Sequence, residues 1–143
     1  MIVYVESSAV LAWLLGESAA PRVREILTAA DHVVTSALTG VECARSLTRA
    51  KLTGRITATQ ELAAQQLYDR AERSWDVSGL TERILNKARA PLPNDPVRTL
   101  DALHVVSASV LQDALGPLVM LSLDDRVRGC AATLGLDVLP ETM

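Results

Sequence analysis

The sequence is poor in aromatic residues: it has no Phe, and aromatics make up 3% of its 143 residues. The hydrophobic fraction is nevertheless 49%, so a core must be built from Ala, Val, Leu and Ile, as in helices packed tightly on a β-branched sheet. A chain of this length can bury one ordinary core but not two. We therefore expect a single domain over residues 1–143.

Positive charge is also scarce. The net charge is −3, and Lys51 and Lys87 are the only lysines among 14 basic residues. This balance argues against a protein that binds nucleic acid through a strongly basic surface overall. A polyanionic partner would have to be bound by a local patch of arginine, whose guanidinium group suits phosphate.

Long apolar runs and paired cysteines are missing as well. No apolar run approaches the ~18 residues needed to cross a bilayer, and the chain enters its first strand-like segment without a basic leader. Cys43 and Cys130 lack the spacing of a zinc or redox motif, so we expect buried free thiols rather than a disulfide. These absences favour a cytoplasmic protein that does not enter the membrane.

The motifs of several common enzyme classes do not occur. There is no glycine-rich loop followed by Lys, which excludes a P-loop nucleotide enzyme, and no Gly-x-Ser-x-Gly elbow, which argues against an α/β hydrolase. A phosphotransferase that uses an Asp after the first strand would need that Asp where this chain has Glu6. A phospho-receiver module would also need a Lys near the crevice, and neither lysine follows a strand.

What the chain does contain is an alternation of strand-like and helix-like segments. Strands are expected at about 2–5, 32–35, 75–77, 118–122 and 136–139, and helices at about 8–15, 21–30, 39–52, 57–74, 81–89, 100–115 and 125–134. This alternation predicts a three-layer α/β/α sandwich with a central, mostly parallel sheet. Thr39 and Glu42 match a capping box, and Thr99 is expected to cap the helix that follows the proline-rich segment 90–98.

Acidic residues recur where strand-like runs give way to helices. They are Glu6, Glu42, Asp101 and Asp124. In an open α/β sheet, ligands collect beyond the carboxyl ends of the strands. Two carboxylates ~5 Å apart repel by roughly 3 kcal/mol at an effective dielectric of about 20, so a cluster of such groups is reasonable only around a divalent metal.

Each acid also has a local explanation. Glu42 completes the expected capping box, Asp101 lies in the first turn of a helix, where negative charge is favoured, and Asp124 or the following Asp can cap a helix. Glu6 is the acid least explained by capping, since serines that cap better stand beside it. His104 follows Asp101 by three residues and could share a metal, although its apolar neighbours favour a buried, hydrogen-bonded histidine.

Together, segments 4–11, 35–42, 98–104 and 122–136 resemble, in order, the sequence motifs of PIN-domain proteins. The length and layout are similar to the toxin ribonucleases of bacterial VapBC-type toxin–antitoxin pairs. The resemblance implies a metal-dependent endoribonuclease that uses Mg²⁺ or Mn²⁺. It also implies a homodimer, and a cognate antitoxin whose tail occupies the acidic groove.

The resemblance also assigns roles to the residues. It implies that Glu6 and Asp101 are direct metal ligands, and that Glu42 and Asp124 hold the metal, its waters or a second ion. Small or acidic neighbours would support the site, and nearby arginines would contact phosphate or pair with an acid. The supporting residues are Ser8 and Asp125, and the arginines are Arg98 and Arg126.

The chain departs from the family pattern at Glu6, where the family usually has Asp. The extra methylene moves the carboxylate oxygens by about 1.5 Å, and positioning errors of that order reduce rates about a hundredfold. This leaves open a catalytically weakened, PIN-like interaction protein. A structure-specific DNA nuclease is a second alternative, although the chain lacks the long insertions that such enzymes use to grip duplexes.

Overall fold

The computed structural model describes residues 1–142, which form one five-stranded sheet in the order β3-β2-β1-β4-β5. All neighbouring strands in this sheet pair in parallel. The strands are β1 (Ile2–Val5), β2 (His32–Ser36), β3 (Asp76–Ser78), β4 (Leu118–Leu121) and β5 (Asp137–Leu139). The predicted α/β class and parallel sheet are therefore confirmed.

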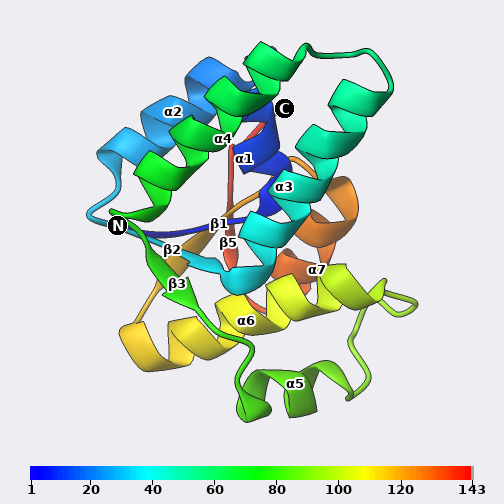
Figure 1. Ribbon diagram of the computed structural model, residues 1–143. Coiled ribbons are helices and arrows are strands. Elements are labelled where there is room, and N and C mark those ends of the chain that lie inside the picture. Colours follow the sequence, from blue (N-terminus) through cyan, green and yellow to red (C-terminus); the bar gives the residue numbers. More distant parts are fainter. Residues whose placement is uncertain (143) are drawn as a thin grey trace.

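Helices cover both faces of the sheet (Figure 1). They are α1 (Ser7–Leu14), α2 (Ala20–Ala29), α3 (Ala37–Leu52), α4 (Ala58–Glu72), α5 (Glu82–Ala88), α6 (Thr99–Leu115) and α7 (Asp125–Thr133). Helices α1 to α4 lie on one side, and α6 and α7 lie on the other with α5 packed outside α6 (Figure 1). In residues 1–142, no helix is both long and apolar enough to span a membrane.

The alternation of β1 divides the core into two clusters. Val3 and Val5 are fully buried toward the helices α1 and α2, whereas the intervening Tyr4 is fully buried toward α6 and α7. Successive side chains of a strand point to opposite faces, which explains why one short strand belongs to both clusters. Cys43 and Cys130 are buried free thiols, one in each cluster, as predicted.

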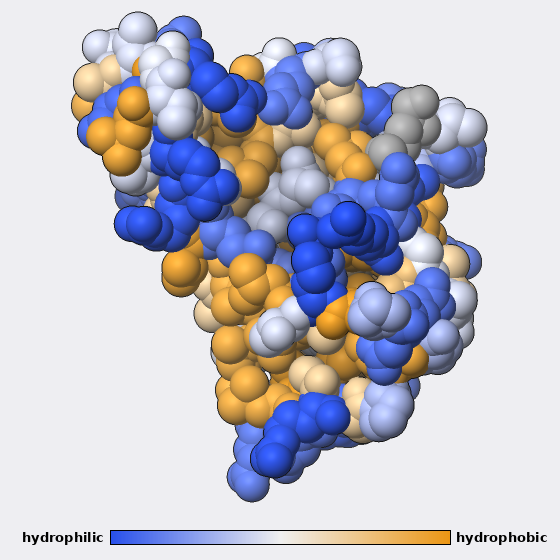
Figure 2. Space-filling view, turned by 90° about the vertical axis from the view of Figure 1, so that its right-hand side faces the viewer, coloured by the Kyte–Doolittle hydropathy of each residue, from blue (hydrophilic) through white to orange (hydrophobic). Residues whose placement is uncertain are grey.

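The strand order creates a crevice beside β1. The chain moves outward from β1 through β2 and β3 on one side, and through β4 and β5 on the other. Ligands in open α/β sheets bind where the order reverses, outside the carboxyl ends of the strands. Figure 2 looks onto this edge, where strongly hydrophilic side chains gather in the middle of a partly apolar face.

The predicted helix caps are wrong at two places. Helix α3 begins at Ala37, because the Ser36 hydroxyl accepts the amide of Leu38 at 3.1 Å. Thr39 therefore lies inside the helix, where it is fully buried, and no capping box joins it to Glu42. A capping box forms instead at the start of α4, between Thr57 and Gln60.

The second error concerns α6. Thr99 is the first residue of this helix rather than its cap, and Arg98 occupies the cap position without a side-chain capping bond. The Arg98 side chain points instead toward the acids described below.

Candidate active site

The predicted acids all lie at the carboxyl edge of the sheet, but they form separate hydrogen-bonded groups. Glu6 follows β1 directly, and Asp124 follows β4 at the start of α7. Glu42 lies in the second turn of α3, and Asp101 lies in the first turn of α6. Glu6 and Glu42 each have partners of their own, whereas Asp101 and Asp124 share Arg98.

Glu6 is held by serine hydroxyls. Its side chain is buried, with the residue 5% exposed. Ser7 donates to Oε1 at 2.7 Å, Ser122 donates to Oε2 at 2.8 Å, and Ser8 also donates to Oε2. The Ser8 hydroxyl in turn accepts the amide of Leu123 at 2.9 Å, so the serine ties β1 to the segment after β4. Ser8 is therefore bonded to the first acid, which is the neighbour that the resemblance assigns to it.

Glu42 is held by a histidine that is itself fixed from behind. The His104 ring is almost fully buried, and its Nε2 bonds to Glu42 Oε1. Its Nδ1 lies 2.8 Å from the hydroxyl of Tyr4. Burial, with added repulsion from the Glu6 and Glu42 carboxylates, raises the pKa of Tyr4 well above its usual value. The phenol therefore stays protonated and can donate to Nδ1, which leaves Nε2–H to donate to Glu42.

The charges of Glu6 and Glu42 also act on buried side chains below the carboxyl edge of the sheet. Both carboxylates act on Tyr4, and both also help burial to raise the pKa of the Cys43 thiol to about 12. Tyr4 lies beneath this pair on one face of the sheet and Cys43 on the other. Both acids therefore influence ionisable groups of the core on either face of the sheet.

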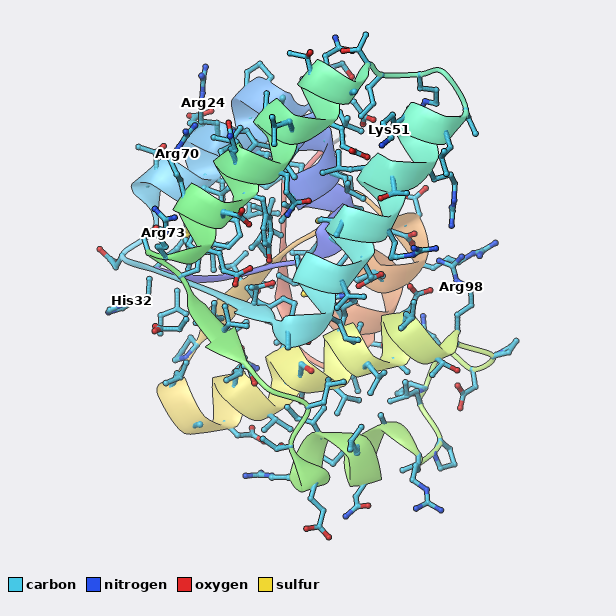
Figure 3. The ribbon with its side chains drawn as sticks, in the orientation of Figure 1. Arg24, His32, Lys51, Arg70, Arg73 and Arg98 are labelled. Atoms are coloured by element: carbon cyan, nitrogen blue, oxygen red, sulfur yellow. The ribbon has the colours of Figure 1, made fainter. Side chains whose placement is uncertain are left out.

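Asp101 and Asp124 are joined by Arg98. The guanidinium Nε donates to Asp101 Oδ2 at 2.7 Å, and Nη2 donates to Asp124 Oδ2 at 3.4 Å. These acids raise the pKa of Arg98, chiefly through the Asp101 bond. Figure 3 shows Arg98 on the side of the molecule opposite Arg24, Arg70 and Arg73.

Asp124 also caps a helix, as the sequence predicts. Its Oδ1 accepts the amides of Arg126 at 2.9 Å and Val127 at 3.2 Å, and so caps α7. Its Oδ2 is turned the other way, toward Arg98. The predicted capping role is therefore confirmed, and it leaves Oδ2 available for other contacts.

Asp125 and Arg126 lie to one side of the acids. Both are exposed on the first turn of α7, and both line a pocket of about 460 Å³ that also includes Asp101 and Arg98. Within residues 1–142, neither side chain forms a hydrogen bond or ion pair with Glu6 or Glu42. The side chains of Asp125 and Arg126 therefore share a pocket lining with Asp101 and Arg98.

The donor set fits a hard divalent cation by its chemistry. Mg²⁺ and Mn²⁺ prefer carboxylate and water oxygens, and the acids supply such oxygens from four separate segments. Arg98 already holds positive charge between Asp101 and Asp124. Among residues 1–142, however, no three His, Cys, Asp or Glu side chains are drawn together closely enough to hold a metal as they stand.

Sequence reasoning missed the partners that hold these acids. It favoured a buried, hydrogen-bonded His104, which is confirmed, but it did not foresee that the partner is Glu42. It also missed Ser122 as a donor to Glu6. The only local signal was the three-residue spacing of Asp101 and His104, which suggests a common face but not a partner on another helix.

Comparisons with known proteins identify the family of this chain. The profile of the PIN domain matches residues 3–129. The chain belongs to the PIN-domain family. It is 31% identical over 137 residues to Ribonuclease VapC46 of Mycobacterium tuberculosis, across 96% of this chain and 95% of that protein. The predicted family membership is therefore confirmed.

A solved structure shares the fold of this PIN-domain chain. The crystal structure of Mycobacterium tuberculosis VapC20, a Sarcin-Ricin loop cleaving toxin, is similar with a TM-score of 0.60. The match covers 89% of this chain and 93% of that one, at 16% sequence identity. This second likeness supports the parallel sheet and its helical layers.

Proposed function

We propose that this PIN-domain protein is a metal-dependent endoribonuclease, the toxin of a type II toxin–antitoxin pair. The observation that carries the proposal is that Asp101 and Asp124 both bond to Arg98 at the carboxyl edge of the sheet, the edge at which Glu6 and Glu42 also lie. The kinship with Ribonuclease VapC46 over nearly the whole chain supports the choice of RNA as substrate.

The four carboxylates would hold Mg²⁺ or Mn²⁺, with Glu6 and Asp101 as direct ligands and Glu42 and Asp124 as holders of the ion, its waters or a second ion. When bound, such an ion makes a coordinated water more acidic and so supplies a nucleophile for hydrolysis of a phosphodiester.

Other side chains of the protein position the carboxylates and the substrate phosphate. Serine hydroxyls fix the Glu6 carboxylate, and His104 fixes that of Glu42, so neither acid must be ordered when substrate binds. Arg98 is 58% exposed at its side chain and bonded to two acids. It is therefore able to turn from them to a non-bridging phosphate oxygen, which a guanidinium binds well.

Two partners belong to the proposal. One is a cognate antitoxin whose tail occupies the acidic groove and inhibits the enzyme. The other is a second copy of the chain, in a homodimer. A cytoplasmic location follows, since the RNA substrate is there.

The test compares Asp101→Asn with Asp113→Asn, a change at the far end of the same helix, where Asp113 pairs with Arg83 and Lys87. Purified protein without antitoxin is incubated with single-stranded RNA and Mn²⁺, and Mn²⁺ binding is followed by calorimetry. We expect Asp101→Asn to reduce RNA cleavage a hundredfold or more and to weaken Mn²⁺ binding, while Asp113→Asn behaves as the unchanged protein.

The same experiment separates the alternatives. Equal cleavage by both variants would contradict the proposed site. Absence of saturable Mn²⁺ binding at millimolar metal would favour the weakened interaction protein. Cleavage of a DNA flap or hairpin in preference to RNA would favour the structure-specific DNA nuclease.

A further inference from the structure

A pocket of about 460 Å³ opens beside the acids, between the segment 94–98 and the first turns of α6 and α7. Pro96 and Val97 form an apolar wall, and Asp101 of the proposed metal site lies in the lining. The volume falls within the range of ~300–1,000 Å³ typical of small-ligand pockets. It suits one nucleotide and is too small for a stretch of duplex.

The polar side chains of this pocket have unused hydrogen-bonding capacity. Asn94, Asp125 and Arg126 line it, and none of their side chains forms a hydrogen bond or ion pair with the rest of residues 1–142. Asn94 offers an amide donor and acceptor, Asp125 accepts N–H groups, and Arg126 offers a guanidinium to phosphate. Such side chains bind base edges and the sugar–phosphate backbone.

We infer that this pocket binds one unstacked nucleotide of single-stranded RNA, immediately next to the bond that is cleaved. The inference rests on the proposed ribonuclease function, because the pocket lining includes Asp101, one of the four acids, and Arg98, which bonds to it. The base lies against Pro96 and Val97, its edge meets Asn94 and Asp125, and its phosphate meets Arg126. Proteins commonly read single-stranded RNA through such splayed bases.

Gly129 gives a way to fill this pocket without touching the acids. It lies one helical turn after Asp125 on α7, so both residues are on the same face. A Cβ at Gly129 would meet only the Asn94 amide nitrogen, at 3.7 Å, an ordinary contact. Because Gly is a poor helix former, a leucine here favours α7 while its side chain projects into the pocket.

The experiment compares Gly129→Leu with Ala132→Leu, which adds leucine to an exposed position of the same helix outside the pocket lining. The substrate is a random-sequence pool of single-stranded RNA 20-mers with Mn²⁺, and cleavage ends are sequenced. We expect Gly129→Leu to lower kcat/KM about tenfold by raising KM, a loss typical of one base contact. The variant should also show a weaker base preference next to the cleaved bond. Gly129→Ala should give a smaller loss, and Ala132→Leu should stay within about twofold.

Two further measurements complete the design. Mn²⁺ affinity is expected to be unchanged in Gly129→Leu, and Asn94→Ala and Arg126→Ala are expected to raise KM without filling any space. Wild-type KM and base preference in Gly129→Leu, Asn94→Ala and Arg126→Ala would overturn the subsite, provided that Asp101→Asn still abolishes cleavage. If Asp101→Asn cleaves normally, the proposed function itself is wrong, so the two failures are distinguishable.

Discussion

At the scale of single residues, Glu6 shows how this chain accommodates an unusual acid. A buried carboxylate is costly unless it is hydrogen-bonded, and serines supply the bonds. These serines also link β1 to the segment after β4. The Glu6 side chain, although longer than that of Asp, therefore has a defined set of hydrogen-bond partners. Glu6 is thus a well-ordered candidate ligand, whose position differs from that of an Asp by about one methylene.

We predict that Glu6→Gln destabilises the protein by about 1–3 kcal/mol. The amide NH₂ of Gln would face hydroxyl groups that now donate to the carboxylate, and at least one buried group would lose its partner. Urea denaturation measures the effect. Glu17→Gln, an exposed position after α1, is the control and should change stability by less than about 0.5 kcal/mol.

Equal stability of the two variants would mean that Gln can reorganise the serine hydroxyls. The hydrogen bonds from the serines would then stabilise the protein equally well with a neutral side chain at this position.

At the scale of secondary structure elements, the start of α3 decides where Glu42 points. Because Ser36 caps the helix, Glu42 lies in its second turn and reaches His104 on α6. With Thr39 as cap, Glu42 would instead have turned back to the helix terminus. Thr39 lies inside α3, where its hydroxyl accepts a hydrogen bond from Thr35 at 2.7 Å and does not cap the helix.

We predict that Ser36→Ala lowers the free energy of unfolding by about 1 kcal/mol, because the amide of Leu38 loses its acceptor at the helix start. Thermal or urea denaturation provides the measurement. Ser46→Ala, in the middle of α3, is the matched control, and alanine there should be neutral or slightly stabilising. A neutral Ser36→Ala would indicate that another group caps this helix.

At the scale of the whole molecule, the parallel strand order brings distant segments to one crevice and closes a core beneath it. Glu6 and Asp124 are far apart in sequence, yet β1 and β4 are neighbours in the sheet. The core below the acids includes Cys43, whose pKa is raised to about 12 by burial and by Glu42 and Glu6. The carboxylates Glu6 and Glu42 therefore affect the ionisation of a thiol in the core.

This coupling predicts a loss of stability at alkaline pH. The ordinary pKa of a thiol is 9.0 and the folded value for Cys43 is about 12, so the folded state keeps a proton that the unfolded chain releases. Its contribution is present below pH 9 and is lost progressively as the pH rises toward 12. The unfolding free energy should fall by about 1 kcal/mol more between pH 8 and pH 10 than in Cys43→Ala.

Urea denaturation at pH 8, 9 and 10 tests this difference, and the Cys43→Ala variant removes the contribution of the other groups that titrate there. Parallel curves for the two proteins would show that the Cys43 thiol is as acidic in the folded chain as in the unfolded one.

The sequence by itself determined the elements, the parallel α/β class, the PIN resemblance and the edge at which the acids lie. Hydrophobic period, strand-to-helix transitions and motif order are properties of neighbouring residues, so they can be read along the chain. Only the tertiary structure decided the partners of the acids: His104 and Glu42 are 62 residues apart, Arg98 and Asp124 are 26 apart, and Ser122 and Glu6 are 116 apart. Hydrogen bonds between such side chains depend on which strands and helices become neighbours, and no local pattern carries that information.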